Sequence, residues 1–244
     1  MSILSHYAHM LDPLVIFFDT GSGANRRLLN ISDIAQDLGH RYCEALLGIY
    51  CFTGEDCNCA FKGKGKTMPI KKMDKKPRYQ EFFARLGDGW VVHDEVVDGL
   101  EQFVCYLYGY PRVKRVNEVR GLMLKKMVGD DESITRKSKV DLSWLPPCKQ
   151  SLIPHIKRAN YRVAQWTMAN IAMPEVPPPI EHGWIRHPGE LIEPVWTEGP
   201  VLPTCLEDIL QHQVEESTSE DESQEDDIIN SDSDISDIED MHGQ

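Results

Sequence analysis

The sequence lacks several features that define whole classes of protein. None of its apolar runs approaches the roughly 20 residues that a membrane-spanning helix needs. Its 7 cysteines include no Cys-x-x-Cys pair, and an odd, scattered set argues against a disulfide framework. No basic segment followed by an apolar one opens the chain, so no signal peptide is predicted. These absences favour a nuclear or cytoplasmic protein with no membrane partner.

Familiar catalytic motifs are missing as well. The chain has no Gly-x-Ser-x-Gly elbow, and Gly63-Lys64-Gly65-Lys66-Thr67 lacks the spacing between glycines that a phosphate-binding P-loop requires. His6-x-x-His9 and Cys57-x-Cys59 have no second half-site nearby in the sequence, so neither predicts a zinc site.

Basic residues are absent from the whole C-terminal part of the chain. The net charge is −13, but no Lys or Arg follows Arg186. Residues 1–186 hold all 26 basic residues and 21 of the 39 acidic ones, a net charge of about +5. A mildly basic body with a strongly acidic tail indicates a nucleic-acid surface joined to an interaction or masking segment.

Hydrophobic patterning predicts an α/β fold that is mostly helical. The continuous apolar run Leu14–Phe18 contains β-branched and aromatic residues, and this is typical of a buried strand in a parallel sheet. Apolar residues at helical spacing predict the remaining elements. The expected helices span 31–38, 41–52, a segment starting near 67–69, 79–86, 94–108, 117–128 and 149–170.

A glycine-rich turn heavy in lysine lies in the middle of the body. Gly63 and Gly65 let the backbone turn tightly, so that their N–H groups and the following helix could face a phosphate. The flanking lysines would add positive charge without reading bases. The expected phosphate-binding residues are Lys62, Gly63, Lys64, Gly65, Lys66, Lys71 and Lys72. The alternative is an ordinary solvated basic face.

The run Ala45–Phe52, Gly54-Glu55-Asp56 and Gly63-Lys64-Gly65-Lys66 resembles the flap-endonuclease branch of the PIN-domain nucleases. That family joins a leucine-rich helix, Gly-x-Asp, a short spacer, Gly-Ile-Gly and Lys. Further motifs are similar to a set of uncharacterised, transposon-associated animal proteins of this type. They include Phe18–Gly21, Pro146–Cys148, Arg158–Tyr161 and His182–Trp184.

This resemblance implies a nuclease core that is truncated at its N-terminus, because the family's Asp-x-Asp strand would precede Met1. Asp56 aligns with a metal ligand of the family, whereas Glu55 replaces its usual Cys or Ser. One aligned aspartate cannot hold two metal ions. Asp56 is therefore expected to be a relic ligand or a helix-terminal cap, and Mg²⁺ is expected only if a complete nuclease site exists.

The resemblance also divides the chain into four expected regions. Residues 1–60 would be the C-terminal part of a PIN-like core with a partial parallel sheet. Residues 61–145 would be a basic helical region that starts like a helix-two-turn-helix element. Residues 146–205 would hold a long helix and a Pro/Trp-rich segment. Residues 206–244, which contain no aromatic residue, would form a disordered acidic tail.

Several serines of the tail have an acidic residue three positions later, a pattern that suits acid-directed kinases and would deepen the negative charge. These candidate phosphorylation sites are Ser217, Ser219, Ser223, Ser231 and Ser236. One hypothesis is that the tail covers the lysine cluster and competes with nucleic acid. Another is that it binds a protein partner, and a third is that it only increases solubility.

Three functions therefore remain open at this point. The leading one is a nucleic-acid-associating remnant that binds the phosphate backbone of DNA or RNA and is not catalytic on its own. The second is a divalent-metal-dependent endonuclease that acts when the missing N-terminal part is present. The third is a protein-interaction scaffold that uses its helices and acidic tail.

Overall fold

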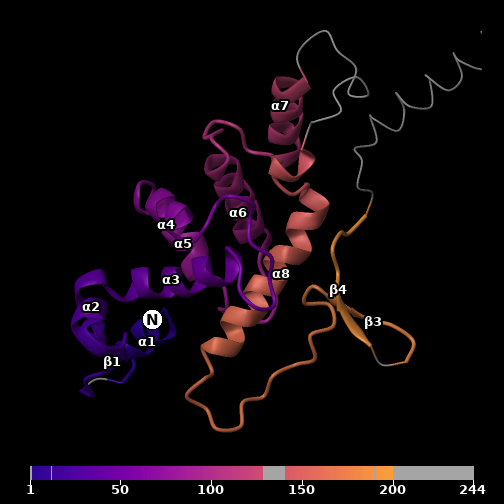
Figure 1. Cartoon of the computed structure of the whole chain (residues 1–244). Helices are drawn as coiled ribbons and strands as arrows, with labels where there is room; N and C mark the ends of the chain where they lie inside the picture. Colours follow the sequence, from indigo (N-terminus) through magenta and orange to yellow (C-terminus); the bar gives the residue numbers. More distant parts are fainter. Residues whose placement is uncertain (1, 12, 129–140, 190, 200–244) are drawn as a thin grey trace, which may run out of the picture. The chain divides into compact units, whose positions relative to one another are not determined.

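Most residues of the body are helical in the computed structural model, which describes residues 2–11, 13–128, 141–189 and 191–199. These residues form eight α-helices and two small antiparallel sheets (Figure 1). The helices are α1 (Ser2–Ala8), α2 (Ile31–Leu38), α3 (His40–Phe52), α4 (Thr67–Asp74), α5 (Arg78–Ala84), α6 (Asp94–Leu107), α7 (Val116–Val128) and α8 (Lys149–Trp166). The strands are β1 (Phe17–Thr20), β2 (Arg27–Asn30), β3 (Trp184–Arg186) and β4 (Ile192–Pro194). The expected helices are confirmed to within a few residues at each end.

The predicted parallel sheet is wrong, and with it the α/β class and the partial PIN-like sheet. Among the described residues, strand β1 pairs only with β2, antiparallel, with Phe17 opposite Asn30. The apolar run Leu14–Phe18 is not buried either, since Leu14 is 64% exposed and Phe17 52% exposed. A parallel strand needs a crossover connection and cover on both faces. The chain returns through the 3₁₀ turn Gly23–Asn25 instead, so it forms a hairpin with a solvated side.

Helix α3 is the element against which much of the body packs. It follows Gly39, whose φ of 81° ends α2 and turns the chain into α3. At Gly48 helix α5 approaches so closely that a Cβ atom would lie 2.1 Å from the Phe83 carbonyl oxygen. Helix α3 also contacts α1 and α8 (Figure 1). A glycine in mid-helix, which is unfavourable by propensity, is here the condition for helix packing.

The core lies between α3, α5, α6 and α8. The rings of Phe52, Phe83 and Phe103 meet there, with centroids 4.8 to 6.5 Å apart. Leu152 and Ile156 of α8 are fully buried beside them. Each such side chain contributes about 1.5–3 kcal/mol when it leaves water, so this cluster dominates the stability of the fold.

A buried arginine ties the C-terminal described segment to α8. Arg158 is buried and donates hydrogen bonds to the carbonyls of Gly183 (3.2 Å) and Val195 (2.5 Å). Tyr161 of the same helix donates to the Pro177 carbonyl at 2.8 Å. The Gly183 carbonyl also accepts from the Val195 N–H at 2.8 Å, so Arg158 links α8 to a contact that already joins the ends of β3 and β4.

Candidate nucleic-acid interface

The glycine-rich turn lies in a loop directly before α4, as predicted. Gly63 has a φ of 69° and Gly65 a φ of 24°, both in the left-handed region that favours glycine. The Lys64 N–H donates to the Phe61 carbonyl at 3.0 Å and closes the turn. A Cβ atom at Gly63 would lie 2.6 Å from Cζ3 of Trp144, so glycine also makes room for that indole.

Four lysines of this segment lie over aromatic rings. The ammonium groups are 3.9 to 4.9 Å from the ring centroids, within the range of cation–π attraction. The pairs are Lys62 with Trp144, Lys64 with Tyr108, Lys66 with Tyr50 and Lys72 with Tyr106. The rings come from α3, from α6 and its C-cap Tyr108, and from the 3₁₀ turn Leu142–Trp144. This alternation of charge and aromatic surface therefore exists only in the folded chain.

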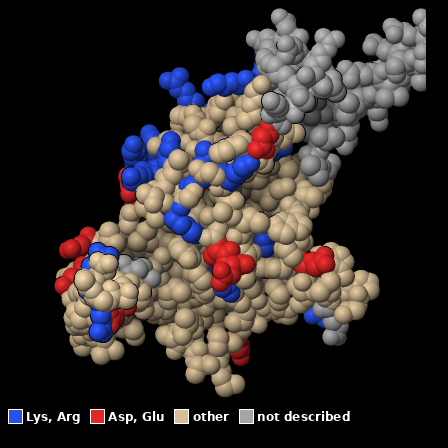
Figure 2. All heavy atoms as spheres, in the orientation of Figure 1, with Lys and Arg blue, Asp and Glu red and all other residues tan. Residues whose placement is uncertain are grey.

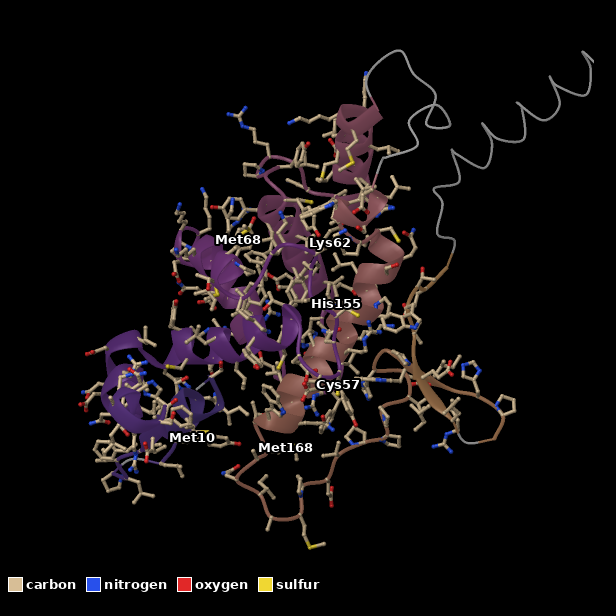
Figure 3. All side chains as sticks on the ribbon, in the orientation of Figure 1. Met10, Cys57, Lys62, Met68, His155 and Met168 are labelled. Atoms are coloured by element: carbon tan, nitrogen blue, oxygen red, sulfur yellow. The ribbon has the colours of Figure 1, made fainter. Side chains whose placement is uncertain are left out.

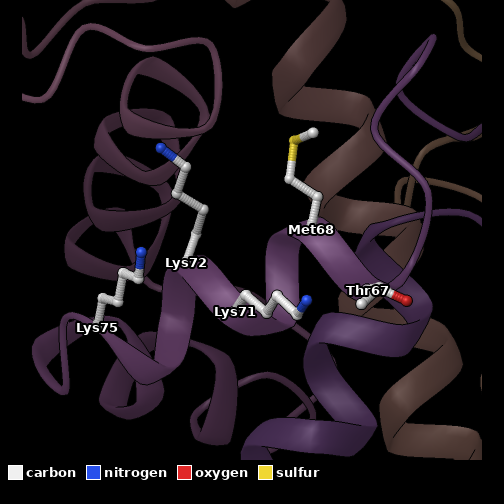
Figure 4. A pocket seen from close by; sticks show the side chains of 5 residues that line it. All are labelled: Thr67, Met68, Lys71, Lys72 and Lys75. Atoms are coloured by element: carbon white, nitrogen blue, oxygen red, sulfur yellow. The ribbon is translucent and has the colours of Figure 1, made fainter.

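Helix α4 carries the rest of the basic surface because its two faces differ. Pro69 and Met73 face the core and are buried. Lys71, Lys72 and Lys75 lie on the outside and, with Thr67 and Met68, line a shallow pocket of about 330 Å³ (Figure 4). Lys and Arg side chains gather on this side of the molecule around α4, as Figure 2 shows. We call Lys64, Lys71, Lys72 and Lys75 the lysine face.

Electrostatics within the lysine face favour an anion. Burial, and then the neighbouring ammonium group of Lys72, lower the pKa of Lys64. The second cause shows that two like charges are held near one another. Such a pair is stabilised when a negatively charged group comes between or beside the two ammonium groups.

Two of the predicted phosphate-binding lysines are already engaged by the protein. Lys66 donates to the carbonyl oxygens of Tyr50 and Gly54, and burial lowers its pKa. It therefore satisfies carbonyl oxygens at and just beyond the C-terminal end of α3 and holds the loop there. Lys62 donates to Asp141 (2.7 Å) and to the Ser143 hydroxyl. Lys66 supports the loop, while Lys62 stays 43% exposed at its edge.

The predicted metal ligand Asp56 does not belong to a carboxylate cluster. It is exposed at the tip of a tight turn in which Glu55 and Asn58 exchange backbone hydrogen bonds of 3.0 Å. The Glu55 side chain points inward and is 3% exposed, with Oε1 3.4 Å from Nε of Arg162. Within the described ranges no three His, Cys, Asp or Glu side chains are placed to share a metal ion. These residues do not fit a two-Mg²⁺ nuclease centre.

The aromatic partners were not anticipated from the sequence. Trp144 and Tyr108 are separated from the lysine loop by dozens of residues, and no spacing rule links them to it. The five predicted phosphorylation sites lie outside the described residues.

Comparison with protein families, with curated proteins and with solved structures finds no match for this chain. None of the described helices is long and apolar enough to cross a bilayer. The resemblance to flap endonucleases thus rests on the sequence motifs alone. What the geometry itself contributes is a lysine face interleaved with aromatic rings.

Proposed function

We propose that this protein binds the sugar–phosphate backbone of DNA or RNA through its lysine face. The observation that carries the proposal is the alternation of lysines and aromatic rings around one loop and one helix. Lysines supply the salt-dependent attraction to phosphate, and the exposed rings of Tyr50 and Trp144 tolerate any base because every base has a π face.

The mildly positive body supports this proposal. Residues 1–186 carry a net charge of about +5, although the whole chain is at −13. A basic surface on a body of this kind steers polyanions toward it. The glycine loop before α4 holds Lys64 close enough to Lys72 that, after burial, the Lys72 ammonium group also lowers the pKa of Lys64.

We further propose that this association is not catalytic in the chain as it stands. Cleavage of a phosphodiester by two metal ions needs several carboxylates around one point. The one aligned aspartate, Asp56, is exposed to solvent, and the side chain of the neighbouring Glu55 is directed at Arg162 instead. The motif order that resembles flap endonucleases is in keeping with a domain that retains binding residues and lacks the cutting ones.

The test is a salt titration of binding to a labelled oligonucleotide duplex, followed by fluorescence anisotropy with the full chain. We expect the logarithm of the association constant to fall linearly with the logarithm of salt concentration between about 50 and 200 mM. The double variant Lys71→Gln/Lys75→Gln should lower affinity about tenfold at the lowest salt. It should also reduce the steepness of the salt dependence by about 2, since each phosphate contact contributes close to one counterion.

The matched control is Arg26→Gln/Arg27→Gln, which removes the same charge from the β1–β2 hairpin, where Arg26 bonds to exposed Asp19. This control should bind like the unaltered protein. Absence of binding at about 50 mM salt would refute the proposal. Equal weakening by the two double variants would show that only overall charge matters and would refute the assigned surface.

A further inference from the structure

A second pocket adjoins the glycine-rich turn before α4, since Phe61 and Lys62 line it. It has a volume of about 210 Å³. Its walls are mainly apolar and aromatic, from Phe61, Tyr108, Leu145 and Pro147, and its polar groups include Lys62 and Ser143. Figure 3 labels Lys62 and His155, which both line it. Flat apolar walls with a few polar groups are the usual composition of a site for a small planar ring.

An exposed tryptophan lies in the chain between two residues that line this pocket, Ser143 and Leu145. Trp144 follows Ser143 directly and is 47% exposed, although indole rings are usually largely buried. The missing side chain of Gly63 allows the ring to lie against the loop, with Cζ3 2.6 Å from the Cβ position. Nζ of Lys62 lies 4.9 Å from the ring centroid. The indole is thus held in place while much of its surface faces solvent.

Lys62 is positioned at the junction of the pocket and the tryptophan. Asp141 and Ser143 accept hydrogen bonds from its ammonium group, which fixes the group at the rim. Lys64 lies over the ring of Tyr108, a wall of the same pocket, 4.5 Å from its centroid. The ammonium groups of Lys62, which is paired with Asp141, and of Lys64 therefore both lie over aromatic rings at or beside this recess. A phosphate chain that passes them would bring its bases next to the recess.

We infer that this pocket, with the neighbouring Trp144, takes one unstacked base of a single-stranded nucleic acid. The inference rests on the proposed function and gives it a substrate class. Bases of a duplex are stacked on their neighbours and cannot reach a recess of this kind without being extruded, whereas bases of a single strand present their faces freely. Stacking on aromatic residues then adds affinity that a phosphate contact alone does not supply.

The experiment compares three ligands of equal length with the full chain: a single strand, the same strand with abasic sugars, and the corresponding duplex. Oligodeoxythymidylate and oligouridylate serve as parallel single strands that identify whether DNA or RNA is preferred. We expect the abasic strand to bind about tenfold more weakly than the base-bearing strand, because a stacked base adds affinity of that order. The duplex should also bind more weakly than the base-bearing strand.

Variants assign the effect to the pocket. Trp144→Ala should lower affinity for the base-bearing strand about tenfold and leave the abasic strand unchanged. Ala60→Leu, at an exposed position that lines the pocket, should fill the recess and cause the same selective loss. Trp196→Ala is the matched control, since Trp196 is an exposed tryptophan that lies against Arg158 instead. Thermal unfolding of each variant verifies that it is folded.

The outcomes separate the inference from the function on which it rests. If abasic and base-bearing strands bind equally well to the unaltered protein, the base pocket is rejected while phosphate binding stands. If Trp144→Ala weakens both strands alike, the indole acts on the fold or the charge and not on a base, and the pocket is again rejected. If no strand and no duplex binds, the proposed function itself has failed.

Discussion

Replacing Gly48 with alanine should lower the free energy of unfolding by as much as about 3 kcal/mol, the upper range for overpacking a core. The added Cβ would lie 2.1 Å from the Phe83 carbonyl oxygen and 2.9 Å from its carbon. These are backbone atoms of α5, so no side-chain rotation relieves the clash. The helices α3 and α5 would have to separate, which would loosen the packing around Phe52 and Phe83. Urea-induced unfolding followed by circular dichroism measures the change.

Gly121 provides the matched control for this substitution. It also lies inside a helix, α7, but no heavy atom stands within 4 Å of the Cβ position. Alanine is favoured over glycine in a helix by about 1 kcal/mol, so Gly121→Ala should leave stability unchanged or raise it slightly. If Gly48→Ala proved as harmless as Gly121→Ala, the close crossing of α3 and α5 would be incorrect.

Acidification should destabilise the protein through His155. This residue is buried among Phe52 and Phe61, and its Nε2–H donates to the Phe52 carbonyl at 2.7 Å. Burial lowers the pKa of His155 from 6.5 to about 4. The unfolded chain therefore binds a proton more readily than the folded one between pH 6.5 and 4. Stability is lost as pH falls through that window, by about 3 kcal/mol in all.

Unfolding in urea at pH 7.5 and at pH 5 tests this dependence. The variant His155→Gln should show a smaller difference between the two pH values, whatever its absolute stability. A residual difference is expected because burial also lowers the pKa of His6. His187→Gln serves as the control, since His187 is exposed beside Glu193, and it should retain the full difference. An unchanged difference in His155→Gln would contradict the assignment to His155.

The helices were predictable because they depend mainly on local sequence features, such as apolar residues at helical spacing and glycine at a helix end. The helix expected over 31–38 does end at Leu38, and the φ of 81° at Gly39 stops it there. Apolar residues at helical spacing located α6 and α8 within a few residues. Whether β1 belongs to a parallel sheet or to an antiparallel hairpin was not predictable in this way. The run Leu14–Phe18 is apolar whether it is buried in a sheet or half-exposed in a hairpin, and only the neighbouring segments decide between the two.

The candidate site, too, was recognisable from the sequence only in part. The glycine loop and the lysines of α4 were recognisable from composition and spacing. The inward turn of Lys66 toward Tyr50 and Gly54 was not, because a lysine in a basic run carries no sign of which carbonyls it will meet. The packing of Trp144 against Gly63 was not recognisable either, because it brings together segments that are far apart in the chain.

The sequence by itself determined the approximate extent of the helices from α2 onward, where the backbone turns at Gly63 and Gly65, and that positive charge is confined to residues 1–186. These properties follow from dihedral preferences and from short-range periodicity. Tertiary structure alone decided that the sheets are antiparallel hairpins, which lysines remain available to a ligand, and which rings stand beside them. Those outcomes depend on contacts between residues distant in sequence, and such contacts are selected by packing of the whole core rather than by any local preference.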